Sequence, residues 1–351
     1  MSLIIEKIDC DIKKVPLKHP FITALHEVDE IESVRVKVTL SDGTCSIGTA
    51  TPNEKVTGDS LQTAQDVIKN VITPVLVGKD FDNWNECLSL LKNSIVHNTP
   101  AKAAVEIALY NARAKESKQS LVNLLGSSAG STKTDYTISI GSQDHMVNEA
   151  KDLVGQGFSA LKIKLGANSL LEDIDTVKKI GQAVGDKISL RIDCNQAWNC
   201  KQTLQASRAW QSAGTNVAFI EQPVKKDAIE DMVYLTAHSL IPIMADESVA
   251  SYEDAINLLE NRACDYINIK LMKTGGLSEA IKINDLAQAH NVNTMVGCMI
   301  EPVESIAAAV AFAVANKNVQ FIDLDSIFMA TGDPDLEKYL SLKGNVITLK
   351  G

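Results

Sequence analysis

The chain has 351 residues, which is more than one hydrophobic core usually supports, so we expect about two domains. Hydrophobic residues make up 45% of the chain and charged residues 22%, as in folded globular proteins. The formal net charge is -10 and no run of lysines and arginines is present, which argues against a nucleic-acid partner.

Membrane and disulfide-rich classes are also disfavoured. The sequence contains no stretch of about 18 apolar residues that could span a bilayer, and its first residues lack the features of a signal peptide. Seven cysteines are scattered along the chain without a CxxC pair. We therefore expect neither a disulfide framework nor structural zinc, but reduced thiols in a cytoplasmic protein.

The first part of the chain predicts strands followed by helices. Residues 3–12 and 32–39 alternate apolar and polar side chains, as half-buried antiparallel strands do. Residues 60–72 and 101–114 instead carry apolar side chains at helical spacing. We expect an α+β capping domain over residues 1–130, ending in the Gly/Ser-rich stretch 126–134.

Beyond that boundary, short β-branched runs recur, each followed by a helical stretch. Polar residues mark strand ends at positions 164, 193, 221, 246 and 270, so successive gaps are 29, 28, 25 and 24 residues. Each gap fits one strand and one crossover helix. The fold class is α/β: a (β/α)8 TIM-type barrel over residues 131–325, with 326–351 returning to the capping domain. An open, doubly wound eight-stranded sheet is the alternative. The β-branched runs that predict the eight strands are residues 137–140, 160–166, 188–193, 217–223, 242–247, 265–270, 293–297 and 320–325.

Three acidic residues end neighbouring strands of the predicted barrel: Asp193, Glu221 and Asp246. Active sites of such barrels lie at the C-terminal ends of the strands. Converging carboxylates repel one another unless a cation neutralises them, and all-oxygen ligation suits Mg²⁺, with Mn²⁺ also compatible. Each acid alone could instead cap a helix or pair with a lysine.

Two lysines, Lys164 and Lys270, end strands two and six, which lie on opposite sides of an eight-stranded barrel. A substrate between them would meet an amine on each face. If a cation and burial lower the lysine pKa from its usual value of about 10.4, a neutral amine can act as a base. Salt bridging to the acids is the alternative, and for Lys162 we hold both interpretations open.

These parts predict proton transfer next to a carboxylate. Removing an α-proton builds an ene-diolate, whose charge a metal ion can stabilise. If one lysine removes the proton and the other returns one from the opposite face, the carbon inverts. The expected chemistry is therefore racemisation or epimerisation.

The motifs together resemble the muconate-lactonizing-enzyme subgroup of the enolase superfamily over essentially the whole chain. They are Lys162-Ile-Lys164, Asp193-x-Asn195, Glu221-Gln-Pro, Asp246-Glu-Ser and Lys270 in NIKLMKTGG. Asp323-Leu-Asp325 at the eighth strand is similar to the signature of dipeptide epimerases, where it holds the α-ammonium group of the substrate.

The resemblance implies further roles. Lys164 and Lys270 would be the two bases, and Lys162 would help to neutralise the substrate carboxylate. Thr137 and the backbone of Cys298 and Met299 match positions that contact the dipeptide, and Asn195 joins the substrate-binding set. Ala-Glu epimerases carry an arginine after a PFxTAL-like segment, and this chain has His26 there. L-Ala-Glu from cell-wall peptide turnover is the leading substrate, with another second residue as an alternative.

Other functions fit parts of the same pattern. A muconate cycloisomerase, an o-succinylbenzoate synthase or an N-acylamino-acid racemase would keep the fold and the metal, but their substrates lack a free ammonium for Asp323 and Asp325. A barrel that binds a dipeptide without turning it over is a third hypothesis. A homo-oligomer is compatible with the sequence, which does not specify the oligomeric state.

Overall fold

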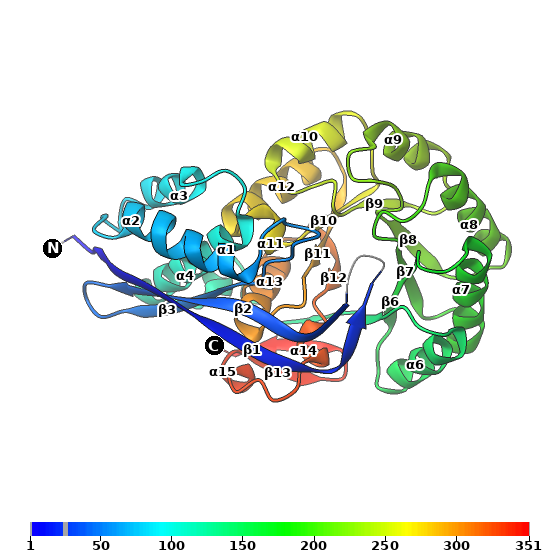
Figure 1. The fold of residues 1–351 in the computed structure, drawn as a ribbon, viewed down its shortest axis with the longest axis horizontal. Helices are drawn as coiled ribbons and strands as arrows, with labels where there is room; N and C mark the ends of the chain where they lie inside the picture. Colours follow the sequence, from blue (N-terminus) through cyan, green and yellow to red (C-terminus); the bar gives the residue numbers. More distant parts are fainter. Residues whose placement is uncertain (1, 24–26, 351) are drawn as a thin grey trace.

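The computed structural model describes residues 2–23 and 27–350 and shows a smaller N-terminal lobe beside a larger barrel (Figure 1). The lobe contains an antiparallel sheet in the order β1-β2-β3, formed by Ile5–Ile22, Glu27–Leu40 and Cys45–Ala50. Alternate side chains of β2 such as Val34, Val36 and Val38 are fully buried. The period-two pattern of residues 32–39 therefore marks the face that packs on the helices.

The helices of the lobe cover one face of this sheet. Ser60 caps the first of them by accepting a hydrogen bond from Thr63 N. The predicted helix over residues 60–72 is present, although its second half is π-helical. The elements are α1 (Leu61–Val67), η1 (Ile68–Ile72), α2 (Thr73–Leu76), α3 (Trp84–Asn93), α4 (Thr99–Glu116) and α5 (Leu121–Leu124).

Eight parallel strands form the larger sheet, paired in chain order from β5 to β12. This confirms the predicted alternation of strands and helices and the α/β barrel class. The strands are β5 (Tyr136–Ile138), β6 (Ala160–Lys164), β7 (Ser189–Asp193), β8 (Val217–Glu221), β9 (Ile243–Ala245), β10 (Tyr266–Ile269), β11 (Asn293–Gly297) and β12 (Val319–Asp323).

Helices surround the barrel on its outer side, as Figure 1 shows. Two of the described helices, α7 and α8, begin at capping boxes; at the start of α7, Ser169 and Glu172 bond each other's backbone. The helices are α6 (Gln143–Gly155), α7 (Leu170–Val184), α8 (Cys200–Ser212), α9 (Ile229–His238), α10 (Tyr252–Glu260), α11 (Leu271–Thr274), α12 (Leu277–Ala289) and α13 (Val303–Ala315). None of the helices among the described residues is both long and apolar enough to cross a membrane.

Glu106 of α4 joins the lobe to the barrel. Its buried carboxylate accepts hydrogen bonds from Ser278 N (2.6 Å) and Ser278 Oγ (3.0 Å) at the start of α12. Gly276 lies so close that an added Cβ would be 2.6 Å from Glu106 Cδ. A residue of the lobe therefore caps the N-terminus of α12, the barrel helix that follows the segment carrying Lys270.

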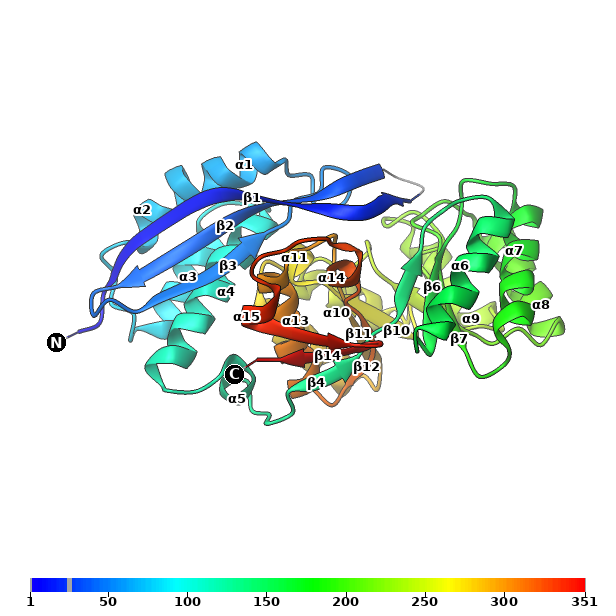
Figure 2. The same cartoon turned by 90° about the horizontal axis from the view of Figure 1, so that it is seen from below.

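The C-terminal segment forms a second small sheet beside the barrel, visible in Figure 2. Its strands β13 (Leu340–Lys343) and β14 (Val346–Leu349) pair with β4 (Ser131–Lys133). Helices α14 (Ser326–Met329) and α15 (Leu336–Tyr339) precede them. Thr331 N donates to Pro16 O of β1. Backbone bonds thus link this segment to β4 and to the N-terminal lobe.

Candidate active site

A cavity of about 140 Å³ lies where the carboxyl ends of the barrel strands face the hairpin of β1 and β2. Side chains alternate along each strand, so the charged residue at a strand end points inward together with the residue two positions earlier. The cavity wall combines lysines and acids from the barrel with Phe21, Val28 and Glu30 from the lobe. The barrel supplies the lysines and most of the acids of the cavity wall, and the lobe covers them.

Asp193, Glu221 and Asp246 converge in this mouth, with carboxylate oxygens within 4.8 Å of one another. Their exposed fractions are 0%, 0% and 1%. Glu221 Oε2 and Asp246 Oδ1 accept no hydrogen bond, although lysine ammonium groups lie beside both. A buried all-oxygen donor set with oxygens left unbonded fits a hard divalent cation.

The pKa values of these acids show how closely their charges are packed. Burial, and next the charge of Asp193, raise the pKa of Glu221 to about 8. Burial also acts to raise the pKa of Asp193, but Lys164 and Lys162 outweigh it and hold that pKa at about 2. The cluster can keep its negative charge only beside cations.

Lys164 and Lys270 lie on β6 and at the end of β10, four places apart in the strand order. Lys164 Nζ donates to Asp193 Oδ2 over 2.6 Å, and Lys270 Nζ donates to Asp246 Oδ2 over 2.7 Å. Both side chains line the cavity. Burial lowers the pKa of Lys270, but the charge of Asp246 outweighs burial and raises it overall, opposite to the lowering that a base requires. A divalent cation bound by Asp246 would offset that charge.

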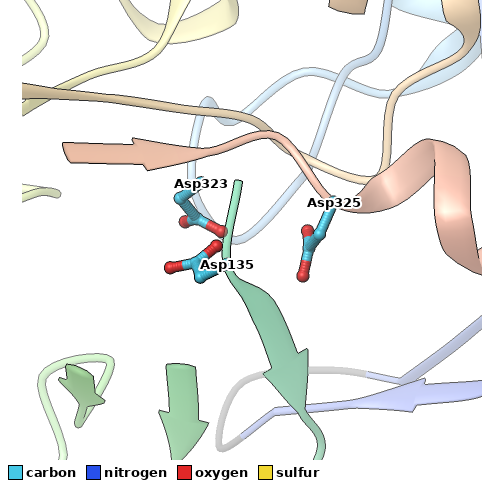
Figure 3. Close-up of side chains that lie close together, drawn as sticks. All are labelled: Asp135, Asp323 and Asp325. Atoms are coloured by element: carbon cyan, nitrogen blue, oxygen red, sulfur yellow. The ribbon is translucent and has the colours of Figure 1, made fainter. Parts of the chain in front are cut away.

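Lys162 lies between two groups of acids. Its Nζ is 2.7 Å from Asp323 Oδ2, 2.9 Å from Glu221 Oε2 and 3.1 Å from Asp193 Oδ2. Asp323 and Asp325 form a second cluster with Asp135, drawn in Figure 3. Asp325 Oδ2 accepts a hydrogen bond from Thr137 N over 2.6 Å. One oxygen of each of the paired aspartates is therefore held by the protein.

Most of the other predicted site residues line the same cavity. Thr137, Asn195, Cys298 and Met299 are among its lining residues. Asn195 Nδ2 donates to Glu247 Oε1 over 3.3 Å. His26 lies outside the described residues, so the structure does not place it.

Two residues beside the acids were not predicted from the sequence. Lys273 Nζ lies 2.5 Å from Asp246 Oδ1 and donates to the Asp246 carbonyl oxygen. Asn268 Nδ2 donates to Glu221 Oε1 over 2.7 Å. The inward alternation of β10 would have indicated Asn268, two positions before Lys270. Lys273 follows Lys270 by three residues, which is close to one helical turn.

Two family models match consecutive parts of the chain. The model for the mandelate racemase / muconate lactonizing enzyme N-terminal domain matches residues 7–126, and the model for the enolase C-terminal domain-like family matches residues 145–348. An L-Ala-D/L-Glu epimerase of Clostridium acetobutylicum is 40% identical over 331 residues, covering 94% of this chain and 92% of the relative.

Solved structures of two epimerases have a fold similar to that of this chain. The L-Ala-D/L-Glu epimerase from Bacillus subtilis, solved as a substrate-liganded complex, matches with a TM-score of 0.97 at 38% identity, covering 99% of this chain and 97% of that one. The dipeptide epimerase from Enterococcus faecalis, in complex with Mg and L-Leu-L-Tyr, matches with a TM-score of 0.93 at 32% identity, with the same coverage.

Proposed function

Because this chain belongs to the mandelate racemase / muconate lactonizing enzyme family of the enolase superfamily, we propose that it is a dipeptide epimerase. It would invert the C-terminal residue of an L-Ala-X dipeptide, with L-Ala-D/L-Glu as the leading substrate. The similarity to L-Ala-D/L-Glu epimerases along nearly the whole chain supports this assignment. The enzyme is an isomerase acting on amino-acid derivatives.

The observation that carries the proposal is the pair of lysines on opposite sides of one acidic cluster. Lys164 bonds Asp193 and Lys270 bonds Asp246. A substrate carbon held between the two amines would meet one on each face. One lysine would accept the α-proton, and the other would deliver a proton to the opposite face, which inverts the carbon.

Asp193, Glu221 and Asp246 would hold the cofactor, which we propose is Mg²⁺, with Mn²⁺ as an alternative. The oxygen donors and the Mg-bound epimerase structure support a hard cation. When bound, the cation would hold the substrate carboxylate and stabilise the charge that develops as the α-proton leaves.

The chain's own residues would orient the two ends of the dipeptide. Asp323 and Asp325 would accept hydrogen bonds from the α-ammonium group. Lys162, whose ammonium lies beside both acid clusters, would help to neutralise the substrate carboxylate. Thr137 and the backbone of Cys298 and Met299, with Asn195, would contact the rest of the dipeptide. For His26 we keep the role of contacting the second side chain as a proposal.

The paired aspartates favour this reaction over its relatives. A cycloisomerase, an o-succinylbenzoate synthase or an N-acylamino-acid racemase acts on a substrate without a free ammonium, so its substrate would offer no cation to the Asp323 and Asp325 carboxylates. A non-catalytic barrel would give no reason for Lys164 and Lys270 on two sides of one cluster. We therefore favour the epimerase.

We also propose a place in the cell for this activity. L-Ala-Glu dipeptides arise from cell-wall peptides, so the enzyme would act in their turnover. Seven cysteines, all unpaired, support a reducing compartment such as the cytoplasm. Assembly into a homo-oligomer is compatible with this role.

The test is hydrogen–deuterium exchange. The protein is incubated in D₂O with Mg²⁺ and either L-Ala-L-Glu or a small library of L-Ala-X dipeptides, and deuterium at the C-terminal α-carbon is followed by NMR. We expect exchange and the appearance of the other epimer. If no dipeptide exchanges its α-proton, the result would contradict the proposed function. The Lys164→Ala, Lys270→Ala double variant is the control for exchange catalysed by the buffer.

A further inference from the structure

We propose that Asp135 and Arg191 are positioning residues that hold the Asp323 and Asp325 pair in place to bind the amino end of the substrate. This inference rests on the function proposed above. Neither residue lines the cavity as described. Both are buried, and they would act through the backbone that carries the paired aspartates.

Asp135 is fully buried immediately before β5. Figure 3 shows its carboxylate next to that of Asp323, and the oxygens of the cluster lie within 4.8 Å of one another. Asp135 Oδ2 accepts a hydrogen bond from Arg191 Nη1 over 2.7 Å, whereas Oδ1 is buried and accepts none. A buried carboxylate in such a place needs a fixed cationic partner.

Arg191 supplies that partner from β7, two positions before Asp193. The same Nη1 also donates to the carbonyl oxygen of Ile322 over 2.8 Å. The guanidinium carbon lies 5.1 Å from the ring centroid of Phe321 and 5.9 Å from that of Phe219. Two aromatic rings thus pack near the guanidinium, which binds Asp135 and the carbonyl oxygen of Ile322 in β12.

The segment around Asp135 is bonded to the segment that carries the aspartate pair at several points. Asp135 N donates to Ile322 O over 3.3 Å, and Leu324 N donates to Thr134 Oγ1 over 2.8 Å. Together with the bond from Thr137 N to Asp325, these contacts close the barrel between β5 and β12. Residues 134–137 and Arg191 therefore determine the position of the backbone from which both carboxylates project.

The charge balance gives Asp135 a second effect on the same subsite. Asp135→Asn would remove the carboxylate partner of the buried Arg191 guanidinium, beside the acid cluster that contains Asp323. An uncompensated cation there would attract Asp323 and oppose a substrate ammonium. A shift of the backbone that carries Asp323 and Asp325 and the change in charge at position 135 should have the same effect. Both should weaken binding of the substrate's free amino end, and neither should act directly on the proton transfer.

The experiment compares two ligands that differ only in the ammonium group. The substrate is the L-Ala-X dipeptide that exchanges fastest, and the matched competitor is propionyl-X, which lacks the amino group. For Asp135→Asn we expect KM for L-Ala-X to rise about tenfold, while Ki for propionyl-X changes less than about twofold. Asp265→Asn, which removes a carboxylate that is bonded to Ile243 N and lies outside the cavity lining, is the matched control.

A second variant keeps the test decisive if Asp135→Asn does not fold. Thr134→Val removes only the hydroxyl that binds Leu324 N, and we expect a smaller rise in KM with the same unchanged Ki for propionyl-X. Equal losses for both ligands, or no change for either, would overturn the inference. If the parent enzyme exchanges no dipeptide at all, the proposed function fails instead, so the two failures are distinguishable.

Discussion

Lys162 Nζ donates a 2.7 Å hydrogen bond to Asp323 Oδ2, and this contact connects the two acid clusters of the barrel mouth. The same ammonium lies beside Glu221 and Asp193. Burial acts to lower the pKa of Lys162, but Asp323 and then Glu221 outweigh it and raise the pKa well above its usual value. Lys162 is therefore a fixed cation between the acids proposed to bind the substrate's amino end and the acids proposed to hold the metal ion.

The first prediction concerns Lys162→Met. Because the ammonium would compete with the proposed metal ion for Asp193 and Glu221, its removal should lower the Kd for Mg²⁺ about tenfold, or ~1.4 kcal/mol. The loss of a cation beside the substrate carboxylate should raise KM for the dipeptide by a similar factor. Calorimetric titration and steady-state kinetics measure the two effects.

The control for this change is Lys179→Met, which removes a lysine that pairs with Asp175 on the exposed face of α7. Neither constant should move in that variant. Weaker Mg²⁺ binding by Lys162→Met would contradict competition between the lysine and the metal.

The second prediction concerns metal and stability. Mg²⁺ bound only by the folded protein should stabilise it, by about 2.7 kcal/mol when its concentration is a hundredfold above Kd. Glu221→Gln should remove most of this gain, because an amide is a poorer ligand than a carboxylate. Thermal unfolding of the parent protein and of Glu221→Gln is measured with EDTA and with Mg²⁺. An equal rise in Tm on adding Mg²⁺ to the two proteins would contradict the assignment of Glu221 as a metal ligand.

The sequence predicts the barrel well because the information is local and repeated. Six of the eight predicted strand runs carry a charged residue at or near their end, and helical periods follow the strands, so the spacing indicates the topology. Positions 193, 221 and 246 then converge as a consequence of parallel strands sharing one edge. The fold and the acidic centre both follow from this repetition.

Contacts between distant segments could not be predicted in the same way. The Gly/Ser-rich stretch that marks the boundary contains β4, which pairs with β14 more than 200 residues later. Asp135 lies outside the strand runs and gains its role from Arg191 and Ile322. Nothing in the local sequence around residue 135 specifies either partner, since a barrel closes by pairing its first and last strands.

The third prediction separates the two lysines. Lys164→Ala and Lys270→Ala should each reduce epimerisation by about 10²- to 10⁴-fold, the usual contribution of an acid–base group. Each variant should still exchange deuterium into one epimer, and the two variants should retain opposite epimers, because each keeps the amine on one face. NMR of pure L,L and L,D dipeptides in D₂O tests this, and retention of the same epimer by both variants would place the amines on one side.

The last prediction is a pH dependence of substrate binding. Burial, and next the charge of Asp323, raise the pKa of Asp325 to about 6. Burial also acts on Asp323, but Lys162 outweighs it and lowers that pKa, so Asp323 stays ionised. In the proposed complex the ionised form of Asp325 would bind the ammonium, so protonation below pH 6 should raise KM for L-Ala-X, approaching about tenfold per pH unit.

This dependence can be assigned to Asp325 by two comparisons. Ki for propionyl-X should not follow the same titration, because that ligand has no ammonium to bind. Asp325→Asn should have a high KM that no longer changes between pH 7 and pH 5, since the titrating group is gone. If the variant keeps the parent's pH profile, another group controls binding, and the carboxylate at position 325 does not hold the amino end.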